Sequence, residues 1–109
     1  FTPKYLAEPS VELEQLCLDM ALSVGPQAFL DQSLALRDRP DQQESLRSVT
    51  VPTLILCGAQ DIVCPLDRHE RMQELIPHAE MVIIDGAGHL PTLEKPEETN
   101  AALIRWLEM

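Results

Sequence analysis

The first part of the chain carries apolar side chains at intervals of three and four positions, the spacing of one face of a helix. Ser10, a residue type that caps helix N-termini, precedes the first series, and Gly25-Pro26 interrupts it before a second series that ends at Arg39-Pro40. This pattern predicts two helices that form a hairpin and bury a shared apolar face against another part of the protein. The apolar positions are Leu13, Leu16, Cys17, Met20, Ala21, Val24, Phe29, Leu30, Leu34 and Leu36.

Beyond Val51-Pro52 the pattern changes to short, continuous apolar runs. Residues 53–57 and 81–84 are rich in β-forming side chains, and a glycine follows each run closely. Strands that are apolar on both faces are typical of buried parallel sheets. A helical pattern between them ends at Pro77, and a last helix opens at Pro96. We therefore predict an α/β protein in which an N-terminal helical hairpin is followed by β-α-β-α with two parallel strands.

Composition and charge exclude several classes of partner and location. With 109 residues, 45% hydrophobic and 24% charged, the chain amounts to one globular domain or less. Its net charge of -10 argues against nucleic acid and anionic membranes as partners. No apolar run approaches the length of about 18 residues that a membrane span needs. The three cysteines form no disulfide framework, which favours a reducing, cytoplasmic location.

The candidate chemistry lies directly after the two predicted strands. Gly58-Ala59-Gln60-Asp61 follows the first, and Gly86-Ala87-Gly88-His89 follows the second. Loops at the carboxyl ends of parallel strands open on the same edge of a sheet, so Asp61 and His89 can meet there. An aspartate that accepts a hydrogen bond from one imidazole nitrogen fixes the tautomer and leaves the other nitrogen free to take a proton. We predict Asp61 and His89 as catalytic acid and base.

These motifs resemble the C-terminal part of α/β-hydrolase-fold enzymes, the serine hydrolase superfamily. The resemblance runs from residues 51–61 and Pro65, through residues 86–89, to residues 94–97 and the closing helix. It implies that Asp61 is the acid and His89 the base of a nucleophile-His-Asp triad acting on esters, lactones or similar carbonyl substrates. It also implies that residues 1–48 are the remnant of a helical cap and residues 49–109 the C-terminal part of the hydrolase core.

One part of the family pattern is missing. The nucleophile of such enzymes lies in a Gly-x-Ser-x-Gly elbow upstream of the acid and the histidine. The four glycines of this chain, at positions 25, 58, 86 and 88, include no pair with that spacing. Loss of the serine alone costs up to about 10⁶ in rate in a comparable triad. We therefore expect the parent protein to be an enzyme and the 109-residue chain alone to be inactive.

Other chemistry-bearing residues have simpler explanations. Cys64 could reach the mouth of the site as a nucleophile, but a small buried thiol is the commoner role, and Cys57 is expected in the core. His69 and His78 are expected to face solvent. The sequence shows no paired ligands for zinc and only half of a dinucleotide fingerprint, so no metal and no cofactor are predicted. Asp61 and His89 themselves could merely cap loops.

Two classes of function remain open. The chain is either the acid-and-base portion of a hydrolase that acts on a small-molecule substrate, or a noncatalytic oligomerisation or ligand-binding module that keeps the scaffold. In the second case binding would survive mutation of His89. In either case the predicted strand 53–57 would expose unpaired backbone groups at a sheet edge, so the isolated chain is expected to self-associate through that edge.

Overall fold

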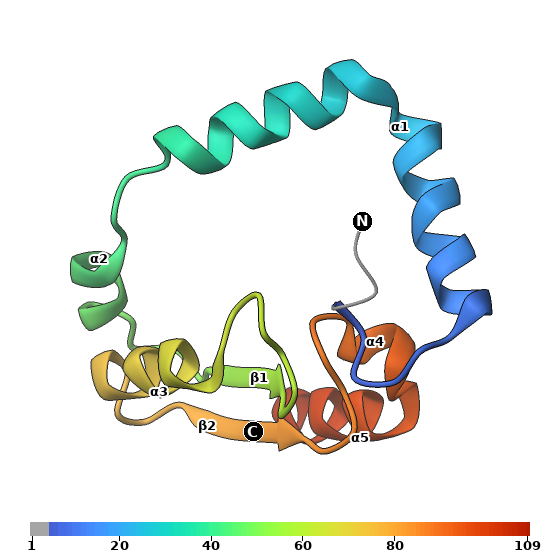
Figure 1. The fold of residues 1–109 in the computed structure, drawn as a ribbon. Helices are drawn as coiled ribbons and strands as arrows, with labels where there is room; N and C mark the ends of the chain where they lie inside the picture. The colour runs from blue at the N-terminus through green and yellow to red at the C-terminus, as the bar shows by residue number, and fades with distance from the viewer. Residues whose placement is uncertain (1–4) are drawn as a thin grey trace.

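The computed structural model of this protein describes residues 5–109, which form seven helices and strands (Figure 1). A long helix and a short one precede an alternation of strands and helices. The elements are α1 (Val11–Asp38), α2 (Gln43–Arg47), β1 (Leu54–Gly58), α3 (Leu66–Leu75), β2 (Glu80–Ile84), α4 (Pro91–Glu94) and α5 (Pro96–Leu107).

The two strands are parallel, as the sequence predicts, and they are direct neighbours. They pair in register from Leu54 opposite Glu80 to Gly58 opposite Ile84. Helix α3 packs against β1, and α5 contacts β2, so the β-α-β-α order of the sequence becomes one small packed unit (Figure 1). Its core consists of Ile55, Leu75, Ile76 and Ala79, with Leu46, Val49, Met72 and Met81 packed around them.

Helix α1 differs from the predicted hairpin. Ser10 caps it as expected, because its Oγ accepts a hydrogen bond from the backbone N–H of Leu13 at 3.2 Å. The expected break is also present: Gly25 has φ 83° and ψ 171°, a conformation open essentially to glycine alone. However, one non-helical residue bends the chain without reversing it, whereas a helical hairpin needs a loop of two to five residues. The two halves of α1 therefore form an arch over the strands (Figure 1).

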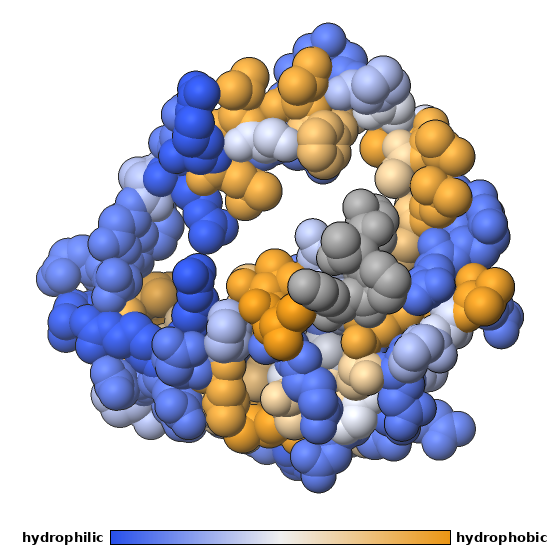
Figure 2. Space-filling model, in the orientation of Figure 1, coloured by the Kyte–Doolittle hydropathy of each residue, from blue (hydrophilic) through white to orange (hydrophobic). Residues whose placement is uncertain are grey.

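The apolar face of α1 is largely uncovered within the described residues. Cys17 is buried, but Phe29 is 68% exposed and Leu22 is 70% exposed. Figure 2 shows hydrophobic residues along the arch and around the opening that it encloses. Large exposed apolar patches are uncommon on monomeric soluble proteins.

Across residues 5–109, none of the helices combines the length and the apolar character needed to cross a membrane. Within the same residues each strand has a single neighbour, so one edge of β1 presents backbone groups that no strand pairs.

Candidate functional site

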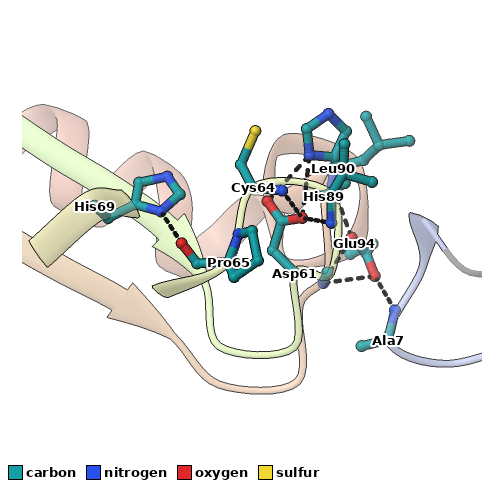
Figure 3. Close-up of polar contacts among 10 residues, drawn as sticks. Ala7, Asp61, Cys64, Pro65, His69, His89, Leu90 and Glu94 are labelled. Carbon is teal, nitrogen blue, oxygen red and sulfur yellow. Dashed lines mark hydrogen bonds and ion pairs between the residues drawn. The ribbon is translucent and has the colours of Figure 1, made fainter. Parts of the chain in front are cut away.

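The candidate site lies where β1 and β2 end. The loop after Gly58 leads to Asp61 and the loop after Ile84 leads to His89, and the two side chains meet above the strand ends (Figure 3). Nδ1 of His89 lies 3.0 Å from Oδ2 and 3.2 Å from Oδ1 of Asp61. The contact that the sequence predicts is therefore present.

A single carboxylate shapes the first loop and contacts the histidine. Oδ1 of Asp61 accepts hydrogen bonds from the backbone N–H groups of Val63 at 2.9 Å and Cys64 at 3.0 Å. Bonds of an aspartate to its own following backbone are a common way to stabilise a turn. The Asp61 side chain is only 6% exposed.

These contacts also set the charge of Asp61. Burial alone raises the pKa of a carboxyl group, but the hydrogen bonds from the Cys64 N–H, the His89 ring and the Val63 N–H favour the ionised form. Together they outweigh burial and bring the pKa of Asp61 below its usual value of 3.8. Asp61 is therefore an anion at neutral pH, as an acceptor for an imidazole N–H must be.

The lowered pKa of Asp61 predicts a specific dependence of stability on pH. Because its folded-state value lies below the unfolded value of 3.8, Asp61 adds stability that is fully present above 3.8 and is lost as the pH falls through the folded-state pKa. The difference in unfolding free energy between wild type and Asp61→Asn, from denaturant titrations, should shrink as the pH falls below 3.8. A difference that stays constant with pH would contradict the assignment. Asp67→Asn, at an exposed carboxylate in α3, is the control.

The two loops are joined by backbone hydrogen bonds. The N–H of Ala59 donates to the carbonyl of Ile84, and the N–H of Gln60 donates to the carbonyl of Ala87, both at 2.9 Å. The approach is so close that a Cβ at Gly58 would overlap the carbonyl oxygens of Ala87 and Gly88. Gly58 is therefore required for the approach of the loops, which brings Asp61 within reach of His89.

His89 is held at its backbone and left accessible at its ring. Its N–H donates to the carbonyl of Tyr5 at 2.7 Å, and the Tyr5 ring lies against the imidazole with centroids 5.7 Å apart. The side chain is 33% exposed. When Nδ1–H is donated to Asp61, the neutral imidazole carries its lone pair on Nε2, which can then accept a proton.

The remaining candidates have structural roles. Cys57 lies in the core as expected, and its burial, with the nearby charges of Asp61 and Glu70, raises the pKa of its thiol. Cys64 is partly buried and contacts the Asp61 carboxylate through its backbone N–H. His78 is exposed as expected.

The expected exposure of His69 is wrong. His69 is buried, and its Nδ1 lies 3.2 Å from the carbonyl oxygen of Pro65 (Figure 3). Its sequence neighbours Arg68 and Glu70 face solvent from the same helix. The charges of these neighbours indicate a solvent-facing segment, but the turn of α3 directs the His69 side chain inward.

In the described part of the chain, no group of three or more His, Cys, Asp or Glu side chains is arranged to hold a metal ion.

Glu94, to which the sequence alone assigns no role, accepts four hydrogen bonds around the His89 loop. Its Oε1 accepts from the N–H of Ala7 at 2.7 Å and of Gly88 at 3.0 Å. Its Oε2 accepts from the N–H of Gly88 at 2.9 Å and of Leu90 at 3.0 Å (Figure 3). The sequence feature that could have indicated this role is the position of Glu94, five residues after His89. The short helix α4, which ends at Glu94, brings the Glu94 side chain back to the His89 loop.

The fold and the site define an open α/β protein with an aspartate-histidine pair at the carboxyl ends of adjacent parallel strands. Residues 13–96 match the alpha/beta hydrolase fold family. The chain belongs to that family.

Individual relatives agree with this assignment. The AB hydrolase superfamily protein YisY of Bacillus subtilis is 31% identical over 97 residues, which are 89% of this chain and 36% of that protein. Epoxide hydrolase A of Mycobacterium tuberculosis is 41% identical over 63 residues, 56% of this chain and 19% of that protein. Among solved structures, an esterase from Exiguobacterium antarcticum superposes with a TM-score of 0.86 at 27% identity, covering 96% of this chain and 39% of that one.

The chain is thus similar to part of each relative. It spans 36% or less of the length of the two curated relatives and 39% of the esterase. The family is shared over most of this chain, whereas the activity of a whole hydrolase also depends on residues that the matched segments do not include.

Proposed function

We propose that this chain supplies the acid and base of a nucleophile-His-Asp triad in a hydrolase acting on esters, lactones or similar carbonyl compounds. The observation that carries the proposal is the contact between His89 Nδ1 and Asp61 Oδ2 at 3.0 Å, at the end of adjacent parallel strands. The similarity to an esterase over 96% of the chain supports the same reaction class.

In the proposed mechanism Asp61 accepts the Nδ1–H of His89 and keeps the imidazole in one tautomer and orientation. Nε2 then takes the proton of a nucleophilic hydroxyl as that group attacks the substrate carbonyl, and delivers it to the leaving alkoxide. In the second half-reaction Nε2 takes a proton from water, which attacks the acyl-enzyme, and returns it to the nucleophile. The anionic Asp61 stabilises the imidazolium formed at each step.

The nucleophile is proposed to come from a part of the polypeptide outside Phe1–Met109. The sequence contains no Gly-x-Ser-x-Gly elbow. Cys64, the candidate nucleophile within the sequence, contacts Asp61 through its backbone, donating its N–H to Asp61 Oδ1 at 3.0 Å. The apolar face of α1 is proposed to line the substrate side of the complete enzyme.

The test is an activity measurement at the length that the gene encodes. Purified protein is assayed with p-nitrophenyl acetate, p-nitrophenyl butyrate and a simple lactone, alongside the isolated residues 1–109. We expect saturable hydrolysis by the full protein and none above background by the isolated chain. If the full protein hydrolysed none of these three substrates, the proposal would be contradicted.

A noncatalytic oligomerisation module is the second candidate. Its contacts would be the unpaired edge of β1 and the uncovered apolar face of α1. Both predict that the isolated chain associates with itself, by strand pairing or by packing of its helices. Light scattering over a dilution series should give a mass above 12.2 kDa. A monomer throughout the series would contradict self-association.

A further inference from the structure

We propose that Glu94 is a positioning residue for His89: its carboxylate holds the backbone on both sides of the histidine and so fixes the imidazole on Asp61. The inference rests on the proposed hydrolase function, and it adds a residue to the machinery that lies outside the Asp61-His89 pair.

The contacts of Glu94 bracket the histidine. The carboxylate accepts hydrogen bonds from the N–H of Gly88, immediately before His89, at 2.9 and 3.0 Å. It also accepts from the N–H of Leu90, immediately after His89, at 3.0 Å. The N–H of His89 itself points to the Tyr5 carbonyl, at 2.7 Å. Three consecutive N–H groups are therefore held from two directions.

The carboxylate also connects the loop to an earlier segment of the chain. Oε1 of Glu94 accepts a fourth hydrogen bond from the N–H of Ala7 at 2.7 Å. Residues 5–7 lie so close to the loop that a Cβ at Gly88 would overlap the Tyr5 carbonyl oxygen. Glu94 thus holds two segments, 5–7 and 88–90, in one fixed arrangement around the histidine.

An ionised carboxylate is the group that this arrangement needs. Among residues 5–109, every hydrogen-bond partner of Glu94 is a backbone N–H donor, and an ionised carboxylate has acceptor sites on both oxygens. Hydrogen bonds in which the acceptor is charged are also stronger than neutral ones. A glutamine of the same length would accept on one side only and would turn an N–H₂ donor toward another donor.

The position of Glu94 distinguishes its role from catalysis. Figure 3 shows its carboxylate on the backbone side of the loop, while the imidazole of His89 extends to Asp61 on the other side. Glu94 therefore affects the reaction by orienting the His89 side chain. His89 Nδ1 and Asp61 Oδ2 are joined by a hydrogen bond of 3.0 Å. A small shift of residues 88–90 is enough to weaken this bond.

The experiment compares Glu94→Gln and Glu94→Asp in the protein at its gene-encoded length. Misplacement of a catalytic group by about 1 Å costs as much as 10²-fold in rate. We expect Glu94→Gln to lower kcat for p-nitrophenyl butyrate by about 10- to 100-fold, with KM nearly unchanged. Glu94→Asp keeps the charge but withdraws it by one methylene group, and should lose about 10-fold. Glu97→Gln, at an exposed carboxylate in the first turn of α5, is the matched control and should keep wild-type kcat.

A spectroscopic measurement separates positioning from general loss of structure. Proton NMR should show the far-downfield signal of the His89 Nδ1–H in wild type and Glu97→Gln, and its broadening or loss in Glu94→Gln at unchanged circular dichroism. If Glu94→Gln does not fold, kcat and the downfield proton signal of Glu94→Asp test the proposal instead. Wild-type kcat and an intact downfield signal in the folded Glu94 variants would overturn the proposal. If His89→Ala also kept activity, the triad assignment itself would fail, which is a different result.

Discussion

Replacement of His89 by alanine in the protein at its gene-encoded length should lower kcat for ester hydrolysis by about 10⁴- to 10⁶-fold. The imidazole is the only group in the proposed mechanism that moves the proton, first from the nucleophile and later to the leaving group. The fold should survive, because the side chain is 33% exposed and the backbone N–H of residue 89 keeps its bond to Tyr5. Steady-state kinetics with p-nitrophenyl butyrate give the measurement.

His78→Ala is the matched control for this experiment. His78 is exposed, and its Nε2 lies 2.9 Å from the carbonyl oxygen of Val51, away from the strand ends that carry the site. Its loss should leave kcat within about twofold of wild type, in the range of a surface substitution. Activity of His89→Ala within tenfold of wild type would mean that His89 is not the base.

Asp61→Asn should have the second largest effect, a fall in kcat of about 10⁴-fold. Asparagine retains one oxygen, which can still accept from the N–H groups of Val63 and Cys64, so the turn of the loop is kept. The amide N–H₂ that replaces the second oxygen cannot accept the Nδ1–H of His89. The histidine then favours the other tautomer, in which Nε2 carries the proton and cannot act as a base.

Asp67→Asn provides the corresponding control, because Asp67 is an exposed carboxylate in the first turn of α3. It removes the same charge without touching the His89 ring. We expect circular dichroism of Asp61→Asn to match wild type while its kcat falls. Equal kcat values for Asp61→Asn and Asp67→Asn would contradict the role of the contact between Asp61 and His89 in the activity.

The sequence predicts the strands and the Asp61-His89 contact because both depend on local signals. A continuous apolar run that ends close to a glycine marks a buried strand, and a single helix between two such runs makes the strands parallel and places them side by side or one strand apart. The acid and base each follow a strand end by a few residues, so the sheet itself brings them together. No long-range packing detail is needed for that inference.

The features that the sequence did not predict depend on geometry beyond the local pattern. Gly25-Pro26 marks a break, but whether the chain reverses or bends depends on how many residues leave the helix, and only Gly25 does. His69 is buried because of where α3 packs, which its charged neighbours do not reveal. Glu94 gathers N–H groups from residues 7, 88 and 90, and the segment around Ala7 is 87 positions away in sequence.

The most direct test of the central claim is to locate the nucleophile that His89 serves. The gene-encoded protein is treated with a fluorophosphonate ester, and the modified residue is identified by mass spectrometry in wild type and His89→Ala. We expect one covalent adduct on a hydroxyl residue outside Phe1–Met109 in the same polypeptide, with labelling strongly slowed in His89→Ala. Labelling that proceeds equally fast without His89, or no adduct in a protein that folds, would contradict the assignment of Asp61 and His89 as a working acid and base.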